Sequence, residues 1–339
     1  MNQISILVTG GAGYIGSHAC LELSLSGYEI VVVDNLCNSS QQSIKRVEKI
    51  LNKKIPFYNL DLRDKKALKS IFRKYSIGQV FHFAGLKAVG ESIEKPIEYY
   101  DNNIIGTLAL LEVMQEFGSK TIVFSSSATV YGNPKTIPVS EDSALSAINP
   151  YGRSKLLIEK ILEDIFVSDE SWRIAILRYF NPIGAHKSGL IGESPKTLPN
   201  NLIPYVSQVA LGKVDKLRIF GSDYDTPDGS GVRDYIHVMD LVKGHIKALQ
   251  ALEKGPQLLT INLGTGKGYS VFDIVKAYEK ISGRKVPYEI VARRNGDVAS
   301  CYSDPSYAAK KLRWKAFYGI EDMCMDDWNW RLNNPDGYL

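Results

Sequence analysis

Residues 6–18 carry the sequence ILVTGGAGYIGSH, in which an apolar run leads through spaced glycines into a helical segment. Gly10 permits a tight turn after the strand, Gly13 lets the backbone approach a pyrophosphate, and Gly16 lets helix and strand pack closely. The helix N-terminus would add N–H donors and a partial positive charge. A glycine triplet is a weak signal alone, but here a strand and a helix flank it. The stretch therefore predicts a dinucleotide-binding turn.

The segments beyond this turn continue the alternation of strand and helix. Short apolar runs predict buried strands over Ile4–Val8, Ile30–Val33, Ile55–Tyr58, Val80–Phe83, Thr121–Phe124 and Ile174–Leu177. Amphipathic stretches between them predict helices over Tyr14–Ser26, Asp64–Tyr75, Pro96–Phe117 and Pro150–Phe166. This order predicts an α/β fold, a Rossmann-type doubly wound parallel sheet with helices on both faces.

The texture of the sequence changes after Tyr179, where prolines, glycines and scattered aromatic residues become frequent. We therefore expect a dinucleotide-binding Rossmann domain over residues 1–179. Residues 180–339 would mainly form a smaller mixed α/β lobe that binds substrate, with some segments returning to the core. Ligands of open parallel sheets bind beyond the carboxyl ends of the strands, so the residues that follow each strand are the most informative.

The composition argues against two classes of partner. The 339 residues are 44% hydrophobic, which is enough for one large domain or two fused ones. The net charge is only +4, and the basic stretches Lys45–Lys54 and Lys65–Lys74 lack interleaved aromatic residues, which indicates solvated helix faces. No apolar run approaches the ~20 residues needed to cross a bilayer. We therefore expect no nucleic-acid partner and no membrane partner.

The cysteines and histidines also lack the spacing of a structural or metal site. Cys20, Cys37, Cys301 and Cys324 are far apart and form no Cys-x-x-Cys pair, which fits a reducing compartment. The five histidines show no ligand spacing, so no metal is expected. The N-terminal segment has no basic region followed by a long apolar one. We expect a cytoplasmic protein.

A second element supports the dinucleotide site and indicates which dinucleotide binds. Asp34 ends the second predicted strand, where a carboxylate would accept hydrogen bonds from the adenosine ribose and repel a 2′-phosphate. No Arg or Lys lies between Asn35 and Ser40, so NAD is expected rather than NADP. Residues after the third and fourth strands also fall where the cofactor should pass; they are Asp61, Leu62, Phe83, Ala84 and Gly85.

The motif Tyr-x-x-x-Lys occurs at three places, of which two are interpreted as unrelated to catalysis. The pairs are Tyr131/Lys135, Tyr151/Lys155 and Tyr307/Lys311. The first contains a glycine and a proline, which predict a loop without fixed side-chain geometry. The third follows no catalytic strand end, and we interpret it as a packed aromatic ring beside a solvated lysine.

The pair Tyr151/Lys155 has the context of a catalytic site. Asn149 is a good N-cap and Pro150 suits the first helical position, so both side chains of the pair would share one helix face. A nearby ammonium, the helix N-terminus and an oxidised nicotinamide would lower the pKa of Tyr151, as a general base requires. Ser127 ends the fifth strand and is predicted to bind the substrate oxygen, whereas Ser125 and Ser126 fit a polar strand cap better.

Strings along nearly the whole chain resemble the extended short-chain dehydrogenases and, within that family, the UDP-glucose (UDP-galactose) 4-epimerases. They are TGGAGYIGSH, DNLCNSS, HFAGLKAVGES, YYDNN, FSSSATVYG, NPYGRSK, LRYFNPIGAH, PNNLIPY, GVRDYIHVMDL and RRNGDVASCYSDP. The resemblance implies an isomerase of carbohydrate and galactose metabolism. Tyr151 would take the C4 hydroxyl proton of a UDP-sugar while the C4 hydride passes to NAD. The 4-ketosugar would then turn and receive the hydride on its other face.

The resemblance also implies residue contacts by position. Cofactor contacts would be made by Tyr14, Ile15, Asp34, Asn35, Leu36, Cys37, Asn38, Ser39, Asp61, Leu62, Phe83, Ala84, Gly85, Leu86, Lys87, Asn102, Tyr151, Lys155 and Phe180. Substrate contacts would be made by Lys87, Ser127, Tyr151, Asn181, Asn201, Leu202, Arg218, Phe220, Arg233, Arg294, Asp297 and Cys301. Arg233 and Arg294 suit a diphosphate on chemical grounds as well, although an Arg in a polar loop is commonly a surface charge.

One position decides how broad the substrate range is. Some family members carry a tyrosine next to the C2 substituent of the sugar, and this chain has Cys301 there. In the family, a small residue at this position leaves room for an N-acetyl group. We therefore expect turnover of UDP-GlcNAc and UDP-GalNAc besides the plain hexoses; the alternative is that other bulk fills the space.

The same fold also occurs in proteins with two other functions. A nucleotide-sugar 4,6-dehydratase shares fold, cofactor and Tyr-x-x-x-Lys, but it needs an acid and a base where this chain has Ala128 and Thr129. A non-catalytic NAD-sensing protein on this fold would typically have lost Tyr151 or Lys155. The resemblance further implies a homodimer through a four-helix bundle, formed by Pro96–Phe117 and Pro150–Phe166 of each subunit.

Overall fold

The computed structural model describes residues 4–195, 201–294 and 297–338, which form two compact units. Unit 1 comprises Met1–Gly132, Leu145–Arg178 and Val242–Ile261. Unit 2 comprises Asn133–Ala144, Tyr179–Leu241 and Asn262–Leu339. The chain therefore enters each unit more than once, and we describe the two units separately.

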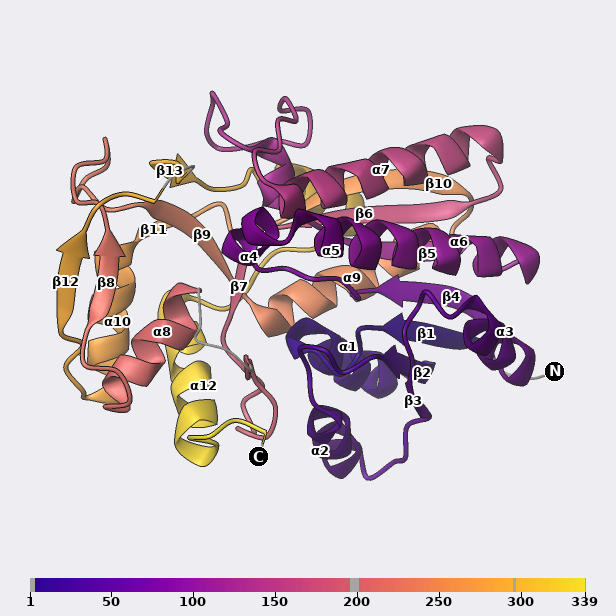
Figure 1. Ribbon diagram of the computed structural model, residues 1–339, viewed down its shortest axis with the longest axis horizontal. Coiled ribbons are helices and arrows are strands. Elements are labelled where there is room, and N and C mark those ends of the chain that lie inside the picture. The colour runs from indigo at the N-terminus through magenta and orange to yellow at the C-terminus, as the bar shows by residue number, and fades with distance from the viewer. Residues whose placement is uncertain (1–3, 196–200, 295–296, 339) are drawn as a thin grey trace. The chain divides into compact units, whose positions relative to one another are not determined.

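Unit 1 is built on a seven-stranded sheet with the order β10-β6-β5-β4-β1-β2-β3 (Figure 1). Its strands are β1 (Ser5–Thr9), β2 (Glu29–Asp34), β3 (Phe57–Asn59), β4 (Ile77–His82), β5 (Thr121–Ser127), β6 (Arg173–Tyr179) and β10 (Gln257–Leu263). The central pairs β1–β2, β1–β4, β2–β3 and β4–β5 are parallel. Strand order reverses on either side of β1, which is the mark of a doubly wound fold. The predicted fold class is confirmed.

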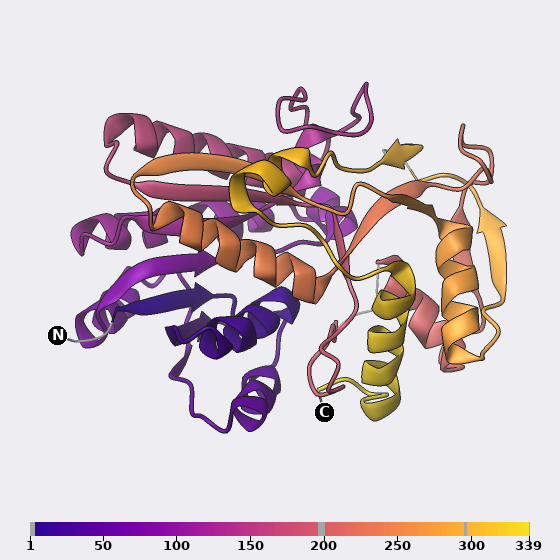
Figure 2. The same cartoon turned by 180° about the vertical axis from the view of Figure 1, so that it is seen from behind.

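Helices cover both faces of this sheet. They are α1 (Tyr14–Leu25), α2 (Gln41–Leu51), α3 (Lys65–Lys74), α4 (Val89–Glu94), α5 (Pro96–Tyr100), α6 (Gly106–Glu116), α7 (Pro150–Ser168) and α9 (Val238–Leu252). Residues of α3, α6 and α7 form one core with alternate residues of the strands, such as Leu7 and Ile122. On the opposite face Phe81 of β4 lies 5.9 Å from His245 of α9, ring centroid to centroid, and Figure 2 shows α9 across that face.

The predicted helix Pro96–Phe117 is not a single α-helix. A π-helical turn, η1 (Asp101–Ile105), separates α5 from α6. A π-turn inserts one extra residue and turns the side chains that follow, and such turns often lie at functional sites. Here the turn brings buried Asn103 to the loop after β4, where its side chain hydrogen bonds to both backbone polar groups of Leu86. Hydrophobic periodicity alone does not reveal such an interruption.

The remaining differences concern elements that the sequence analysis did not assign. Helix α2 begins at the N-cap Ser40, which accepts a hydrogen bond from the backbone N–H of Gln42. Of the two basic stretches that we interpreted as helix faces, α3 contains Lys65–Lys74 entirely, whereas α2 ends at Leu51 and leaves Lys53 and Lys54 outside the helix. The sequence analysis also did not assign helix α4. It did not assign α9 and β10 to the sheet, because they lie far along the chain from the other strands.

Unit 2 contains small sheets and helices around its own core. Its elements are β7 (Asn181–Ile183), α8 (Leu202–Ala210), β8 (Leu217–Phe220), β9 (Val232–His237), β11 (Gly268–Ser270), α10 (Val271–Ser282), β12 (Tyr288–Val291), β13 (Ser300–Cys301), α11 (Ser306–Leu312) and α12 (Ile320–Asn333). Strand β9 pairs with β7, β11 and β13, while β8 pairs with β12. Helices α8, α10 and α12 pack on these strands through Ile203, Ile274 and Met323. Among the described residues, no helix is long and apolar enough to span a membrane.

Candidate active site

The glycine turn joins β1 to α1, and at Gly10 and Gly16 neighbouring backbone atoms leave no room for a side chain. Gly10 has a φ of +68°, and a Cβ there would lie 2.6 Å from the backbone N of Ala84. A Cβ on Gly16 would collide with the carbonyl oxygen of Gly10. Within the described residues, no side chain caps the N-terminus of α1. This bare helix end at the carboxyl edge of the sheet fits a pyrophosphate.

Asp34 is buried and holds the loop after β2 against the glycine turn. Its Oδ2 accepts a hydrogen bond from the backbone N–H of Ala12 at 3.0 Å. Its Oδ1 accepts from the Leu36 N–H at 2.9 Å and from the Ser39 hydroxyl at 2.7 Å. A carboxylate has roughly four lone-pair positions, so these three donors leave capacity for a ribose hydroxyl. The predicted ribose contact therefore also shapes its own loop.

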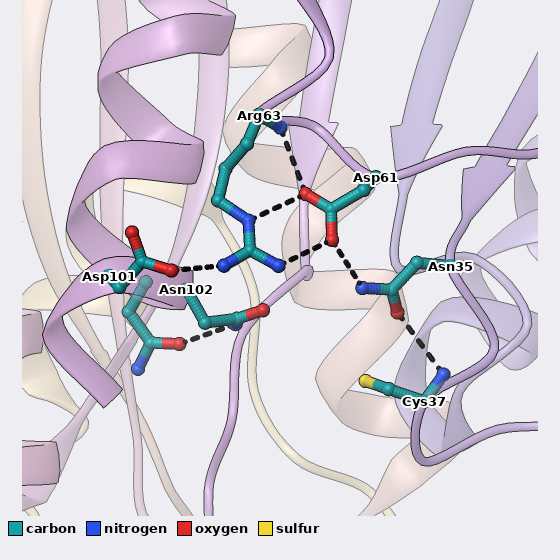
Figure 3. Close-up of polar contacts among 7 residues, drawn as sticks. Asn35, Cys37, Asp61, Arg63, Asp101 and Asn102 are labelled. Carbon is teal, nitrogen blue, oxygen red and sulfur yellow. Dashed lines mark hydrogen bonds and ion pairs between the residues drawn. The ribbon is translucent and has the colours of Figure 1, made fainter. Parts of the chain in front are cut away.

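Asp61 belongs to a polar network that the sequence analysis did not predict (Figure 3). Its Oδ1 accepts hydrogen bonds from the backbone N–H and Nε of Arg63, at 3.0 and 2.9 Å. Its Oδ2 accepts from Arg63 Nη2 at 2.7 Å and from Asn35 Nδ2 at 3.0 Å. The hydrogen bonds from Arg63 hold the pKa of Asp61 well below its usual range. Arg63 also pairs with Asp101 of η1, so it links the loop after β3 to the π-turn.

Asn103 organises the loop after β4, whereas the sequence analysis chose its neighbour Asn102. The Oδ1 of Asn103 accepts hydrogen bonds from the Leu86 N–H at 2.8 Å and from Asn102 Nδ2 at 2.9 Å. Its Nδ2 donates to the Leu86 carbonyl at 3.1 Å and to the Ser154 hydroxyl of α7 at 3.0 Å. The π-turn that presents Asn103 is the signal that was missed, and a run of two asparagines in a helix would have hinted at it.

Helix α7 starts as the sequence predicts and carries Tyr151 in its first turn. The Asn149 side chain accepts a hydrogen bond from the Gly152 N–H at 2.8 Å, so the predicted N-cap is confirmed. The ammonium of buried Lys155 donates to the Ser125 carbonyl at 2.7 Å and lies 6.0 Å from the centroid of the Tyr151 ring. Burial lowers the pKa of Lys155 to about 8, against the negative charge of Glu159, which raises it.

The pKa of Tyr151 lies above its usual value in the protein by itself, so the expected lowering does not arise from the surrounding protein groups alone. Burial raises it, and the hydrogen bond with Ser127 and the charge of Lys87 offset only part of that rise. The ammonium of Lys155 donates its hydrogen bond to the Ser125 carbonyl and not to the phenol. This pKa is that of Tyr151 without the positive charge of an oxidised nicotinamide, which we expected to lower it.

Each residue of the Ser125–Ser127 segment at the end of β5 has polar partners of its own. The Ser127 Oγ accepts hydrogen bonds from the Thr129 N–H at 3.3 Å and from the Thr129 hydroxyl at 3.0 Å. The Ser126 hydroxyl, predicted to cap the strand, instead donates to the buried carboxylate of Glu159. Unit 1 thus brings Ser127, Tyr151 and Lys155 to the carboxyl end of β5.

The two other Tyr-x-x-x-Lys pairs lie in different environments. Tyr131 is fully buried in a 3-10 turn, η2 (Ala128–Tyr131), and its phenol oxygen accepts a hydrogen bond from Arg178 Nη1 at 2.9 Å. The prediction of unfixed geometry at Tyr131 was therefore wrong, because a buried cation holds the ring. Tyr307 in α11 packs below the exposed Lys311, whose Nζ lies 5.7 Å from the ring centroid, as we interpreted from the sequence.

In unit 2, the pairing of β9 and β13 gathers several of the predicted substrate residues. Cys301 is the register partner of Arg233, and Arg233 Nη2 lies 3.9 Å from Asp297 Oδ1. The Arg294 guanidinium stacks 3.7 Å above the centroid of the Phe220 ring. Burial raises the pKa of the Cys301 thiol, and Arg233 offsets part of that rise.

The other predicted residues of unit 2 lie outside this group. Arg218 of β8 forms an exposed ion pair with Glu289, 3.5 Å between Nε and Oε1. Asn181 begins β7, and Phe180 before it donates its N–H to the Leu263 carbonyl at 3.3 Å. Asn201 precedes Leu202 at the start of α8. Among the described residues, no group of three His, Cys, Asp or Glu side chains could hold a metal.

Known proteins resemble this chain along its whole length. The family model described as GDP-mannose 4,6 dehydratase matches residues 7–326. The UDP-glucose 4-epimerase of Bacillus subtilis is 56% identical over 335 residues, which cover 99% of each chain. The crystal structure of UDP-glucose 4-epimerase from Bifidobacterium longum in complex with NAD+ and UDP is 52% identical with a TM-score of 0.95, covering 98% of this chain and 99% of that one. The UDP-Glc/GlcNAc 4-epimerase of Campylobacter jejuni is 38% identical with a TM-score of 0.85, covering 97% and 99%.

The glycine turn yields a prediction that needs no substrate. Gly16→Ala forces the backbone of α1 away from Gly10, because the new methyl group would meet its carbonyl oxygen. We expect a loss of about 1–3 kcal/mol in the free energy of unfolding, the usual cost of overpacking. NAD affinity should fall about tenfold or more, which corresponds to about 1.4 kcal/mol. Both quantities can be measured by thermal unfolding with and without NAD.

Gly90→Ala is the matched control for this variant. A Cβ at Gly90 would meet no atom within 4 Å, and alanine suits its place in α4. Equal effects of the two variants on NAD affinity would show that steric exclusion at the turn is not the cause.

Proposed function

The chain belongs to the extended short-chain dehydrogenases and, within them, to the UDP-glucose 4-epimerases, and from this we infer how its own residues carry out the reaction. It is an NAD-dependent UDP-hexose 4-epimerase that interconverts UDP-glucose and UDP-galactose. The observation that carries this function is the end-to-end match to such epimerases, at 56% identity for the Bacillus subtilis enzyme. Ala128 and Thr129 stand where a dehydratase needs its acid and base, which disfavours that alternative despite the name of the family model.

NAD is the cofactor, and unit 1 supplies the groups that would hold it. The bare N-terminus of α1 suits the pyrophosphate, and Asp34 retains an acceptor position for the adenosine ribose. The loop stabilised by Asn103 and the Asp61–Arg63 network would flank the adenine half. When bound, NAD supplies a hydride acceptor and returns the hydride, so the overall reaction is redox-neutral.

We propose that Tyr151 is the general base and acid at the C4 hydroxyl. The hydrogen bond between Tyr151 and Ser127 offers a path by which the proton can pass between sugar hydroxyl, serine and phenol. Lys155 is a buried cation near this phenol, held in place by the Ser125 carbonyl, and it would also bind the nicotinamide ribose. Lys87 adds a second positive charge that favours the phenolate.

We propose that unit 2 binds the UDP part of the substrate. Arg233 and Arg294 would contact the diphosphate, because a guanidinium pairs with phosphate oxygens in a bidentate manner. Asp297 beside Arg233 would keep that side chain oriented. The remaining proposed contacts with the sugar and nucleotide are Asn181, Asn201, Leu202, Arg218, Phe220 and Cys301.

Tyr151→Phe tests the proposed base. Removing the phenol oxygen takes away the proton acceptor, so kcat for UDP-galactose should fall about 10²- to 10⁴-fold, the usual contribution of general acid–base catalysis. NAD should remain bound, since the ring and Lys155 are unchanged. The measurement is single-turnover epimerisation together with NAD content.

Tyr307→Phe is the matched control, because it changes a tyrosine of the same motif that lies on α11 in unit 2. It should leave kcat within about twofold of the parent, as surface substitutions usually do. A Tyr151→Phe enzyme as active as this control would refute the assignment of the base.

We propose that the enzyme also accepts UDP-GlcNAc and UDP-GalNAc. Cys301 is a small, partly buried residue next to Arg233 in register, and it leaves more room than the tyrosine found in some relatives. The similarity to a UDP-Glc/GlcNAc 4-epimerase supports this range.

Cys301→Tyr should abolish turnover of the N-acetyl sugars and spare the plain hexoses, because the phenol ring fills the space beside C2. Initial rates with UDP-galactose and UDP-GalNAc, resolved by chromatography, measure the two activities. Cys301→Ser keeps the side chain small and should retain both. An equal loss of both activities in Cys301→Tyr would contradict the proposal.

We propose a homodimer through α4–α7 on the basis of exposed apolar side chains. Ile93 is 62% exposed, Ile97 82%, Ile105 49% and Leu157 47%, and they lie on α4, α5, η1 and α7. These elements pack against one another within unit 1. Several exposed apolar side chains on elements that pack together favour a protein–protein interface there. The widely spaced cysteines support a cytoplasmic location, which we also propose.

Ile97→Glu should convert the dimer to a monomer, because it places a charge at the most exposed of the four apolar side chains. Sedimentation or light scattering measures the mass. Leu25→Glu, at the exposed end of α1, introduces the same charge on another element and should leave the dimer intact. A parent protein that is monomeric at micromolar concentration would overturn the proposal.

A further inference from the structure

A buried ionic network lies next to the catalytic residues in unit 1. The Arg178 guanidinium of β6 donates from Nε to Glu159 Oε1 at 3.1 Å and from Nη2 to Glu159 Oε2 at 2.7 Å. Its Nη1 donates to the Tyr131 phenol oxygen at 2.9 Å, and the Ser126 hydroxyl donates to Glu159. Glu159 is 0% and Arg178 3% exposed, so solvent does not weaken the pair.

The four residues of this network come from the elements that hold the proposed catalytic groups. Ser126 directly precedes Ser127 in β5, and Tyr131 ends the η2 turn that follows it. Glu159 lies four residues after Lys155 and eight after Tyr151 in α7, which puts all three on one helix face. Arg178 connects these elements from the neighbouring strand β6.

We propose that Glu159 and Arg178 are positioning residues, which fix the rotation of α7 against β5 and η2 so that Tyr151, Lys155 and Ser127 meet at the substrate. This inference rests on the roles proposed above for those three residues. A planar guanidinium bound to both carboxylate oxygens permits one relative orientation of its two elements. Apolar packing would tolerate small rotations and shifts of the helix. A misplacement of about 1 Å can cost roughly 10² in rate.

Stability alone does not account for the network. Taking two charges out of water is costly, and replacing a buried ion pair by apolar residues of similar volume is often neutral or stabilising. Burial alone would lower the pKa of Arg178, but the hydrogen bonds and charge of Glu159 outweigh that effect and raise it. The guanidinium therefore keeps its charge, and we attribute to the pair the fixed relative orientation of α7 and β6 rather than a gain in stability.

The charge of Glu159 has a second consequence at Lys155. The titratable groups around Lys155 are Tyr151 and Glu159 on α7 and His82 on β4, and beyond Glu159 lie Arg178 and Tyr131. Burial, together with the charge of Lys155, lowers the pKa of His82 to about 3, so this histidine stays neutral. Among these groups, Glu159 is thus the anion that favours the charged form of Lys155. Removing its charge would lower the pKa of Lys155 below about 8, so the ammonium would be lost at lower pH.

Three variants of the NAD-loaded enzyme distinguish the effect of Glu159 on the position of α7 from the effect of its charge on Lys155. Glu159→Gln keeps the shape and removes the charge, so the alkaline limb of the kcat/KM profile should move down by about one pH unit. Glu159→Asp keeps the charge and shortens the reach, so kcat should fall roughly tenfold or more while that limb stays in place. Changing four polar members together (Ser126→Ala, Tyr131→Phe, Glu159→Met, Arg178→Met) removes both partners of each side-chain hydrogen bond named above. It should retain the melting temperature within a few degrees yet lose roughly 10² in kcat.

A readout independent of activity is the titration of Lys155 in the protein without NAD. NMR of isotopically labelled lysine gives this pKa, with the resonance assigned from its absence in Lys155→Met. It should fall in Glu159→Gln and stay in Glu159→Asp. If the fourfold variant does not fold, these two single variants decide the outcome, with rates expressed per site that binds NAD.

The control is a buried ionic pair elsewhere, Asp327 and Arg331 of α12, 3.5 Å between Oδ1 and Nε. Asp327→Asn should lower the melting temperature without moving the pH profile. A folded fourfold variant with parental kcat and profile, or a Glu159→Gln profile that does not move, would overturn the positioning role. If Tyr151→Phe remains active, the proposed role of Tyr151 as the base is wrong. If Tyr151→Phe is inactive but the Glu159 variants behave like the parent enzyme, the base is retained and only the positioning role is wrong.

Discussion

The close approach of the chain to itself at the glycine turn is the constraint on which unit 1 depends. A Cβ on Gly10 would lie 2.6 Å from the backbone of Ala84, so the ends of β1 and β4 can meet only across a glycine. The same turn leaves the first N–H groups of α1 without a capping side chain in the described residues. Asp34 then ties the end of β2 to this turn through Ala12. Three strand ends are thereby fixed at the edge where a dinucleotide binds.

Three carboxylates connect further loops and helices to this turn or to the neighbouring strands through hydrogen bonds within the protein. Asp34 holds its own loop, Asp61 and Arg63 join the loop after β3 to the π-turn, and Glu159 joins α7 to β6. In each case the acid accepts hydrogen bonds from two or more donors, which fixes the orientation of its carboxylate. A conspicuous acid in a sequence motif therefore has two functions here. It fixes the conformation of its own segment, and its remaining lone pairs can accept hydrogen bonds from a ligand.

The local parts of this site could be predicted from sequence, whereas its tertiary connections could not. The turn at Gly10, the N-cap Asn149 and the helical pair Tyr151/Lys155 follow from residues close in the chain, and the periodicity of apolar residues indicates the sheet. Arg63 and Asn103 act through partners far along the chain or through a π-turn, which leave no periodic signal. For the same reason Tyr131 was mistaken for a mobile loop residue, since its partner Arg178 is 47 residues away. Resemblance to known epimerases supplied the substrate residues, which composition and spacing did not.

The raised pKa of Tyr151 means that the proposed base is a neutral phenol in the protein by itself. Burial favours the neutral phenol, and the Ser127 hydrogen bond and Lys87 do not overcome it. Lys155, although close, is bonded to the Ser125 carbonyl. A further positive charge beside the ring is needed to tip the balance toward phenolate, and an oxidised nicotinamide carries one. In the proposed mechanism the phenolate would therefore be populated chiefly while the bound cofactor is oxidised, which would link proton removal from the sugar hydroxyl to hydride removal. The charge of Glu159 opposes the effect of burial on the pKa of Lys155, and the Ser125 carbonyl accepts a hydrogen bond from its ammonium, so the proposed mechanism requires no change of charge at this lysine.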